Sequence, residues 1–351
     1  MPVFENGSIF DIAQSIKAFL NVEAGMVHGR KPRFGSRPNA AKVPGVSGES
    51  GAQARRLGLA GRWIAEQGKK LKRIRGSLTN AEVGGINPAN IVWIFGAGRT
   101  GSTWLARMME ELEGYALWFE PWVGALFDPY HLRLGDRKGR HFILAPRYRK
   151  TWRRSIRNLV LDGAYVRFPE VTEDEYLVIK EPGGSIGSPL LMEALPESRM
   201  ILLVRDPRDI TASWLDAHRE GGWRSAGDSA EASSHRAVIV AKRYLQQVGE
   251  AKRAYEAHEG RKVLVRYEEL RADTLGTMKR IYSELGIPAD EGELERAVKE
   301  HSWENIAEDE KGEGKFYRKA KPGGWREDLT PEQVKTVERI TAPLLDELYP
   351  S

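Results

Sequence analysis

The chain has 351 residues, with 54 lysines and arginines against 49 aspartates and glutamates, and no cysteine. Without cysteine it can form neither disulfides nor a thiolate metal site. It has no apolar run of about 18 residues that would span a bilayer, and its first residues lack the basic start and apolar core of a secretion signal, so we expect a cytoplasmic protein with a large α/β core.

The first 90 residues read as a basic extension, and we place the main domain at residues 91–351. The extension holds 14 basic and 6 acidic residues, a net charge of +8, whereas the rest holds 40 and 43, a net charge of −3. Residues 29–51 have the Gly, Pro and Ser content of a linker. Residues 52–75 form a basic amphipathic helix in this interpretation. Two placements stay open for it: docking on the domain, or peripheral contact with an anionic membrane.

Apolar strands and amphipathic helices alternate along the main domain. Strands are predicted at 91–95, 115–119, 175–180, 199–204 and 262–266, and helices at 102–112, 188–195, 209–218, 232–257 and 272–285. This alternation is typical of a three-layer α/β/α fold with a central parallel sheet. Residues 220–234 are predicted to be a lid or a loop, and Thr330 with Pro331 is predicted to start a last helix, whose apolar side packs in the core.

The strand at 91–95 runs directly into a glycine-punctuated turn and a helix, IVWIFGAGRTGSTW. Gly96, Gly98 and Gly101 let the backbone approach an anion closely, and the following helix directs unpaired N–H groups toward it. The segment is therefore predicted to be a P-loop-like cradle for a phosphate group.

Three ligands fit such a loop. As GxGxxG it matches a dinucleotide fingerprint, with Glu120 near the spacing of the ribose-binding acid. As a nucleoside triphosphate loop it lacks the required lysine, because position 102 is serine. The third interpretation rests on Arg99-Thr100-Gly101-Ser102-Thr103-Trp104. This stretch resembles the 5′-phosphosulfate loop of sulfotransferases, with Gly98 in place of the usual proline.

Two further segments resemble the same family. MILLVRDPRDITASWLD, residues 200–216, places a strand, Arg205 and a helix carrying Ser213 in the order of the sulfotransferase 3′-phosphate motif. RKAKPGGW, residues 318–325, resembles the carboxyl-terminal RKGxxGxW loop, with Ala320 in place of the glycine. The resemblance covers residues 91 to about 348.

The resemblance implies a donor, 3′-phosphoadenosine 5′-phosphosulfate (PAPS), its product adenosine 3′,5′-bisphosphate (PAP), and no metal. Arg99 is expected at the transferring sulfonate. The backbone of Gly98 and Gly101 and the hydroxyls of Thr100, Ser102 and Thr103 are expected at the 5′-phosphate. Trp104 and Tyr267 are expected near the adenine, and Arg205, Ser213, Arg318, Lys319 and the Ala320 backbone at the 3′-phosphate.

An acceptor hydroxyl needs a general base. Glu120 is the first candidate, because Phe119-Glu120-Pro121 resembles carbohydrate 6-O-sulfotransferases, and this favours a sugar or glycolipid acceptor. Glu181 is the second candidate, and Lys180 beside it is expected to stabilise the sulfonate. His131, His141, His218 and His235 are further possible bases. Ten basic residues and one acid between Arg133 and Arg157 also favour an anionic acceptor.

Two rival functions stay open at this point. One is a nicotinamide-dependent oxidoreductase, and the other is a non-catalytic nucleotide-binding membrane adaptor. Nucleic acid is not an expected partner, because no recognised binding module accompanies the basic charge.

Overall fold

The computed structural model describes residues 85–128, 141–224 and 230–349. The chain divides into two units, Met1–Lys72 and Arg73–Ser351, and every described residue belongs to the second. The predicted linker and basic helix, and His131, lie outside the described residues. The proposed domain start at residue 91 stays a prediction, although Ile86 is already buried in the core beneath the sheet.

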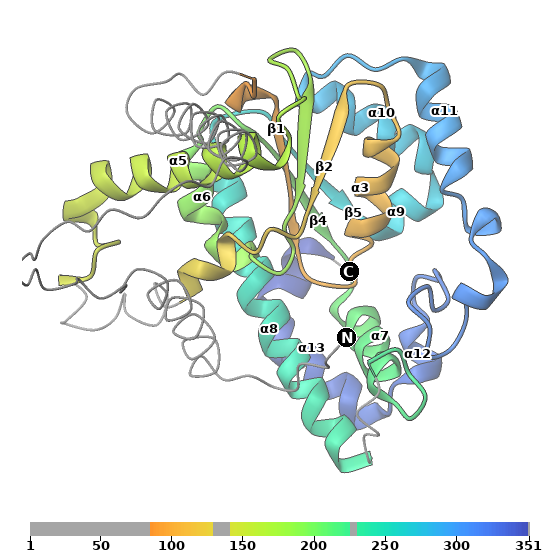
Figure 1. Ribbon diagram of the computed structural model, residues 1–351. Helices are drawn as coiled ribbons and strands as arrows, with labels where there is room; N and C mark the ends of the chain where they lie inside the picture. The colour runs from red at the N-terminus through yellow and green to blue at the C-terminus, as the bar shows by residue number, and fades with distance from the viewer. Residues whose placement is uncertain (1–84, 129–140, 225–229, 350–351) are drawn as a thin grey trace, which may run out of the picture. The chain divides into compact units, whose positions relative to one another are not determined.

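A five-stranded parallel sheet forms the centre of this unit, in the order β2-β3-β1-β4-β5 (Figure 1). The strands are β1 (Ile91–Gly96), β2 (Tyr115–Phe119), β3 (Tyr176–Lys180), β4 (Arg199–Val204) and β5 (Lys262–Arg266). They match the predicted strands to within one residue at each end. The predicted fold class is confirmed.

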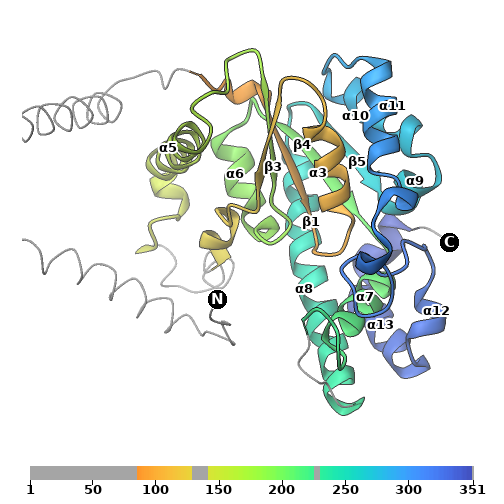
Figure 2. The same ribbon diagram turned by 45° about the vertical axis from the view of Figure 1, so that its right-hand side comes forward.

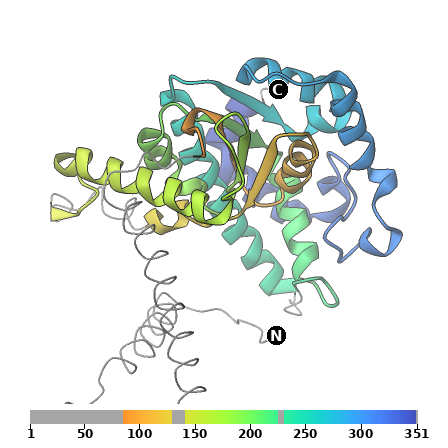
Figure 3. The same cartoon turned by 45° about the horizontal axis from the view of Figure 1, so that its top comes forward.

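The side chains of β1 alternate between two cores, one on each face of the sheet. Trp93 and Phe95 point into a core with α5 (Arg149–Arg167), α6 (Ser188–Ala194), α8 (Ala230–Ala257) and α13 (Pro331–Leu348). Val92 and Ile94 point into a core with α3 (Ser102–Glu110), α10 (Thr274–Leu285) and α11 (Glu291–Glu300). The two helix layers are visible in Figure 2, and Figure 3 shows α5 and the α10–α11 pair on opposite sides of the sheet.

The helices predicted for the main domain are all present, with small shifts at their ends. α7 begins at Pro207 and ends at His218, α8 begins inside the predicted lid, and α13 begins at Pro331 with the predicted capping box between Thr330 and Gln333. Val337, Leu344 and Leu348 of α13 are buried as predicted, whereas Val334, Ile340 and Leu345, also predicted to pack in the core, are only half-buried.

Four α-helices of the described residues were not predicted: α5, α9 (Tyr267–Ala272), α11 and α12 (Trp325–Asp328). α5 begins in the basic run and continues ten residues beyond it, and its many arginines accompany a buried stripe of Trp152, Ile156, Val160 and Ala164. That spacing of four residues is a helical signal, which charge alone does not reveal. No helix in the described part of the chain is long and apolar enough to cross a membrane.

The carboxyl ends of β1, β3 and β4 lie side by side in the sheet, so the loops after them share one edge. Gly96 allows the close contact between β1 and β4, because a Cβ there would lie 2.2 Å from the Leu203 carbonyl oxygen. Arg99, Lys180 and Arg205 occur at these strand ends, as predicted.

Candidate active site

One cavity of about 480 Å³ opens at this edge of the sheet. Fourteen of the sixteen predicted site residues line it: Gly98, Arg99, Gly101, Ser102, Thr103, Trp104, Glu120, Lys180, Arg205, Ser213, Tyr267, Arg318, Lys319 and Ala320. Thr100 and Glu181 do not. The sheet therefore brings together segments that are more than 200 residues apart in the sequence.

The glycine loop presents the amino terminus of α3 to the cavity. Gly101 precedes the helix in the left-handed conformation, φ 86°, and no side chain caps the helix there. The first N–H groups of α3 are thus available to an anion. A Cβ on Gly101 would lie 2.7 Å from the Tyr267 ring, so glycine is required on steric grounds too.

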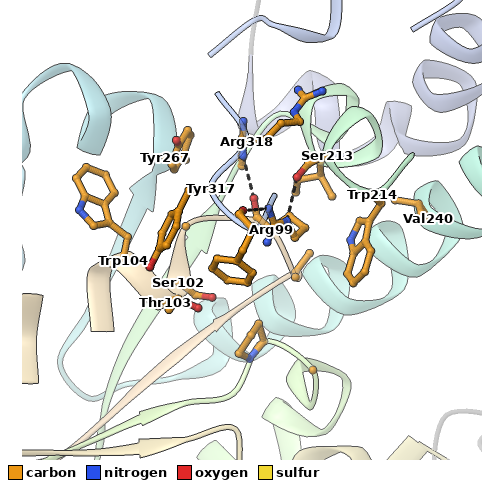
Figure 4. Close-up of a pocket in the computed structure, with 18 of the residues that line it drawn as sticks. Arg99, Ser102, Thr103, Trp104, Ser213, Trp214, Val240, Tyr267, Tyr317 and Arg318 are labelled. Carbon is orange, nitrogen blue, oxygen red and sulfur yellow. Dashed lines mark hydrogen bonds between the residues drawn. The ribbon is translucent and has the colours of Figure 1, made fainter. Parts of the chain in front are cut away.

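The hydroxyls of this loop differ in their surroundings. Ser102 and Thr103 lie in the first turn of α3 and face the cavity (Figure 4). Thr100 is fully buried, and its hydroxyl donates to the Ala97 carbonyl at 2.9 Å. Its hydroxyl thus stabilises the loop, whereas Ser102 and Thr103 can donate to a ligand.

Arg99 and Arg318 lie near each other in the cavity (Figure 4), and Arg205 joins them by donating to the Arg99 carbonyl at 3.1 Å. Burial, followed by the nearby charges of Arg205 and Arg318, lowers the pKa of Arg99 from 12.5 to about 10. Arg205 is largely buried, and its Nε has no hydrogen-bond partner among the described residues. Three cations held together with an unsatisfied donor form a strong binding site for an anion such as a phosphate.

Ser213 of α7 lies with this cluster, where its hydroxyl accepts a hydrogen bond from Arg99 Nε at 2.9 Å. Arg99 also donates to the Phe316 carbonyl, and its guanidinium lies 5.5 and 4.6 Å from the ring centres of Trp223 and Phe316. The Arg99 side chain thus lies with the predicted 3′-phosphate residues, not beside Glu120 and Lys180.

The carboxyl-terminal loop closes the cluster. Arg318 and Lys319 both pair with Asp328 of α12, each at 2.8 Å. Ala320 adopts φ 46°, the left-handed conformation for which glycine is suited, and its carbonyl accepts from Arg271 Nε at 3.1 Å.

Asp209 of α7 holds this loop in place. It is fully buried, and its two carboxylate oxygens accept from the backbone N–H groups of Gly323 and Trp325 at 2.7 and 2.9 Å. Sequence analysis missed this residue. The only signal was its place in Arg-Asp-Pro-Arg-Asp, which is equally typical of a charged helix start.

Trp104 and Tyr267 form one end of the cavity (Figure 4). Their rings meet edge to face with centres 6.4 Å apart, and the Trp104 indole N–H donates to the His301 carbonyl at 2.7 Å. The Arg205 guanidinium lies 4.2 Å from the Tyr267 ring centre. A flat aromatic ring can pack here while an attached phosphate reaches the arginine cluster.

Glu120 and Lys180 form an ion pair at the carboxyl ends of β2 and β3. Lys180 is almost completely buried, and this burial lowers its pKa although Glu120 opposes the shift. The Glu120 side chain keeps 30% of its surface exposed, so a ligand in the cavity can reach it. The pair joins a carboxylate to a cation.

Glu181 points away from the cavity. Its carboxylate accepts from the backbone N–H groups of Trp122 and Gly124 at 3.0 and 3.3 Å, and burial raises its pKa to about 7. These bonds hold the turn that follows β2. The arrangement makes Glu181 a support for the Glu120 segment.

Of the candidate histidines in the described residues, His218 alone lines the cavity, and its Nδ1 lies 2.9 Å from the Trp214 carbonyl oxygen. No described residue of the basic run 133–157 lines it. Within the described ranges, no group of three His, Asp or Glu side chains could hold a metal ion.

The comparisons with known proteins agree with this geometry. The model of the family "Sulfotransferase domain" matches residues 90–348. The chain belongs to the sulfotransferase domain family. Among the three interpretations of the glycine loop, this membership favours the phosphosulfate loop.

Two Arabidopsis thaliana proteins resemble this sulfotransferase chain in sequence. Cytosolic sulfotransferase 17 is 28% identical over 193 residues, which cover 46% of this chain and 56% of the relative. Cytosolic sulfotransferase 16 is 27% identical over 207 residues, which cover 51% of this chain and 60% of the relative. The chain thus spans little more than half the length of these curated relatives.

Solved sulfotransferase structures resemble it more distantly. A mouse sulfotransferase complexed with PAP is 15% identical, with a TM-score of 0.49, over 73% of this chain and 85% of that one. A sulfotransferase from Mycobacterium avium is 18% identical, with a TM-score of 0.46, over 80% of each chain.

Proposed function

We propose that this protein transfers a sulfuryl group from PAPS to a hydroxyl of an acceptor. One observation carries the proposal: a buried cluster of Arg99, Arg205 and Arg318 lies in the same cavity as an uncapped helix terminus and the Lys180–Glu120 pair. Such a cavity suits a ligand with two separate anionic groups next to a reacting centre.

The donor would be held by groups that this chain already positions. Amide groups of the glycine loop with the Ser102 and Thr103 hydroxyls would bind the 5′-phosphate, and Arg205, Ser213 and Arg318 the 3′-phosphate. The unsatisfied Nε of Arg205 supports this fit, because a phosphate oxygen would give it an acceptor. Trp104 and Tyr267 would pack on the adenine.

When bound, PAPS supplies a sulfur that forms a bond to the acceptor oxygen while its bond to the bridging oxygen breaks, which leaves PAP. The protein has to align the two oxygens and stabilise charge. Lys180 would donate to the oxygens of the transferring group. Glu120 would take the hydroxyl proton, and its exposed position supports it over Glu181.

The position of the Arg99 side chain supports a different role for this residue from the one that its motif position implies. Its bond to Ser213 favours the 3′-phosphate, not the sulfonate that its motif position suggests. The sugar or glycolipid acceptor rests on Phe119-Glu120-Pro121 alone, and a membrane contact rests on residues outside the described ranges. The curated relatives are named cytosolic, which supports a cytoplasmic location.

Calorimetric titration with PAP, 5′-AMP, NAD and ATP tests the donor, followed by mass spectrometry of acceptors incubated with PAPS. We expect PAP to bind at least about tenfold more tightly than 5′-AMP, since the arginine cluster makes charge-assisted bonds to the additional phosphate. Selective binding of NAD would support the oxidoreductase instead. PAP binding without a sulfated product over a broad acceptor panel would support the non-catalytic alternative.

A further inference from the structure

The cavity has a second end, opposite Trp104 and Tyr267, that the donor scheme does not use. Trp214 of α7 and Val240 of α8 lie on this side of Arg99 (Figure 4). Trp122, at the turn after β2, also lines the cavity and is half exposed. Together these side chains contribute apolar, largely aromatic surface to the cavity. We call Trp122, Trp214 and Val240 the acceptor wall.

Two arginines border the acceptor wall, and neither has an acidic partner among the described residues. The Arg224 guanidinium lies 5.1 Å from the centre of the Trp214 ring and 5.0 Å from that of Trp223. Arg243 lies on the exposed part of α8 and also lines the cavity. In the part of the chain that the structure describes, no carboxylate lies within ion-pair distance of either one, whereas Arg253, further along α8, pairs with Glu250.

The charge around the cavity is strongly one-sided. Seven arginines and two lysines line it, against one carboxylate among the described residues, that of Glu120. Arg99, Arg205 and Arg318 belong to the buried cluster, and Lys180 pairs with Glu120. Lys319 pairs with Asp328, and Arg271 lies 5.7 Å from the centre of the Trp104 ring at the adenine end. Arg224 and Arg243 offer their charges to another anion, on the side of the cavity away from the adenine end.

α8 positions Arg243 relative to the loop that follows Lys180. The Gln247 side chain donates to the Gly183 carbonyl at 3.2 Å, which fixes α8 beside the loop that follows Lys180. Arg243 and Val240 are four and seven residues before Gln247, on the same side of the helix. At about 1.5 Å per residue they lie roughly 6 and 10 Å farther out along the helix axis.

Resting on the proposed sulfuryl transfer, we propose that the acceptor is an amphiphilic hydroxyl compound with an anionic group. Its hydroxyl lies at Glu120 and its apolar or aromatic body packs on the acceptor wall. Its carboxylate or other anion, at the end of that body away from the hydroxyl, is bound by Arg224 and Arg243. The arginines also offset the repulsion between this anion and the charged donor.

Matched probes isolate the charge of the acceptor. They are hydroxyphenyl alkanoates of increasing chain length and their methyl esters, titrated by calorimetry into the full-length protein saturated with PAP. We expect at least one acid to bind about tenfold more tightly than its ester, because charge-assisted bonds to arginine are lost in the ester. Arg224→Gln and Arg243→Gln should remove most of this preference and leave ester affinity unchanged.

Arg253→Gln is the control, since it removes one charge from the same helix outside the cavity. It should keep the preference for the acid. If no acid binds more tightly than its ester, or if the preference survives both Arg224→Gln and Arg243→Gln, the inference is wrong.

The proposed function is judged separately, from PAP titration and from sulfation of the esters. Sulfated esters without a preference for acids would leave the function standing and remove the anionic acceptor. Absence of PAP binding would remove both.

Discussion

The guanidinium of Arg205 lies 4.2 Å from the centre of the Tyr267 ring, and its buried Nε has no hydrogen-bond partner in the described residues. One residue at the end of β4 thus links the adenine end of the cavity to the arginine cluster. A ligand that occupies both places would satisfy the donor that the protein leaves unpaired.

The first prediction follows from this link. Arg205→Ala should weaken PAP binding by about ten- to a hundredfold, since a charge-assisted bond contributes roughly 1.5–3 kcal/mol. Binding of 5′-AMP should change much less, because it lacks the 3′-phosphate. Calorimetry with both nucleotides measures this, with Arg253→Ala as the control. Equal losses for the two nucleotides would contradict the 3′-phosphate assignment.

A substitution at Arg99 distinguishes two possible roles for its guanidinium, at the 3′-phosphate or at the transferring sulfonate. If its guanidinium serves the 3′-phosphate together with Ser213, Arg99→Ala should weaken PAP binding by about tenfold and spare 5′-AMP. A role at the transferring sulfonate would instead leave PAP affinity unchanged and lower turnover alone. PAP affinity and single-turnover rates on the same variant distinguish the two.

The two glutamates are predicted to differ in kind. Glu120→Gln keeps the shape of the side chain but cannot take a proton, so turnover should fall by roughly a hundredfold to ten-thousandfold with PAP affinity nearly unchanged. Glu181→Gln should instead lower stability by about 1–3 kcal/mol, because an amide nitrogen would face a backbone N–H group. Rates at saturating substrate and denaturant titrations measure the two effects. A large loss of turnover in folded Glu181→Gln, with Glu120→Gln near normal, would give the base role to Glu181.

Titration of Glu181 should make the free energy of unfolding depend on pH. Its pKa is about 7 in the folded protein, against 4.5 for an ordinary glutamate. Between these values the folded state holds a proton that the unfolded chain has released, so the free energy of unfolding falls as pH rises through this window. Denaturant titrations across it should show the fall in the wild type and a flatter profile in Glu181→Gln. Parallel profiles would contradict the raised pKa.

A substitution at Ala320 is predicted to raise the stability of the protein, whereas the substitutions above lower binding, turnover or stability. The left-handed backbone of an alanine at φ 46° costs roughly 1 kcal/mol, so Ala320→Gly should stabilise the protein by about 0.5–1 kcal/mol. Ala307→Gly is the matched control, because φ is −59° there and glycine should destabilise. Chemical denaturation measures both. A loss of stability in Ala320→Gly would show that another contact favours the methyl group.

The strands, the glycine loop and most of the cavity residues were predictable from sequence because their signals are local. Arg99, Lys180 and Arg205 each lie at or just after the end of a buried strand, so a parallel sheet places all three at one edge. The start of the last helix was also locally coded, by Thr330 and Gln333.

The remaining features depend on packing between distant segments. The hydroxyl of Thr100 donates to Ala97, and Glu181 binds the amides of a turn that no motif marks. Trp214 and Val240 face the cavity because α7 and α8 pack side by side, which their sequences do not specify. α5 was not predicted from the sequence, because arginines surround the apolar residues of its buried side and dominate the composition of the segment.

The bonds from Asp209 to Gly323 and Trp325 have a consequence for synthesis of the chain. All five strands precede residue 267, so the sheet can assemble while the carboxyl-terminal loop is still being translated. Until that loop reaches Asp209, Arg318 is absent from the cluster and the nucleotide has an incomplete site. In the cell, bound nucleotide would therefore protect full-length chains from proteolysis. Chains whose translation stopped before the carboxyl-terminal loop would lack this protection.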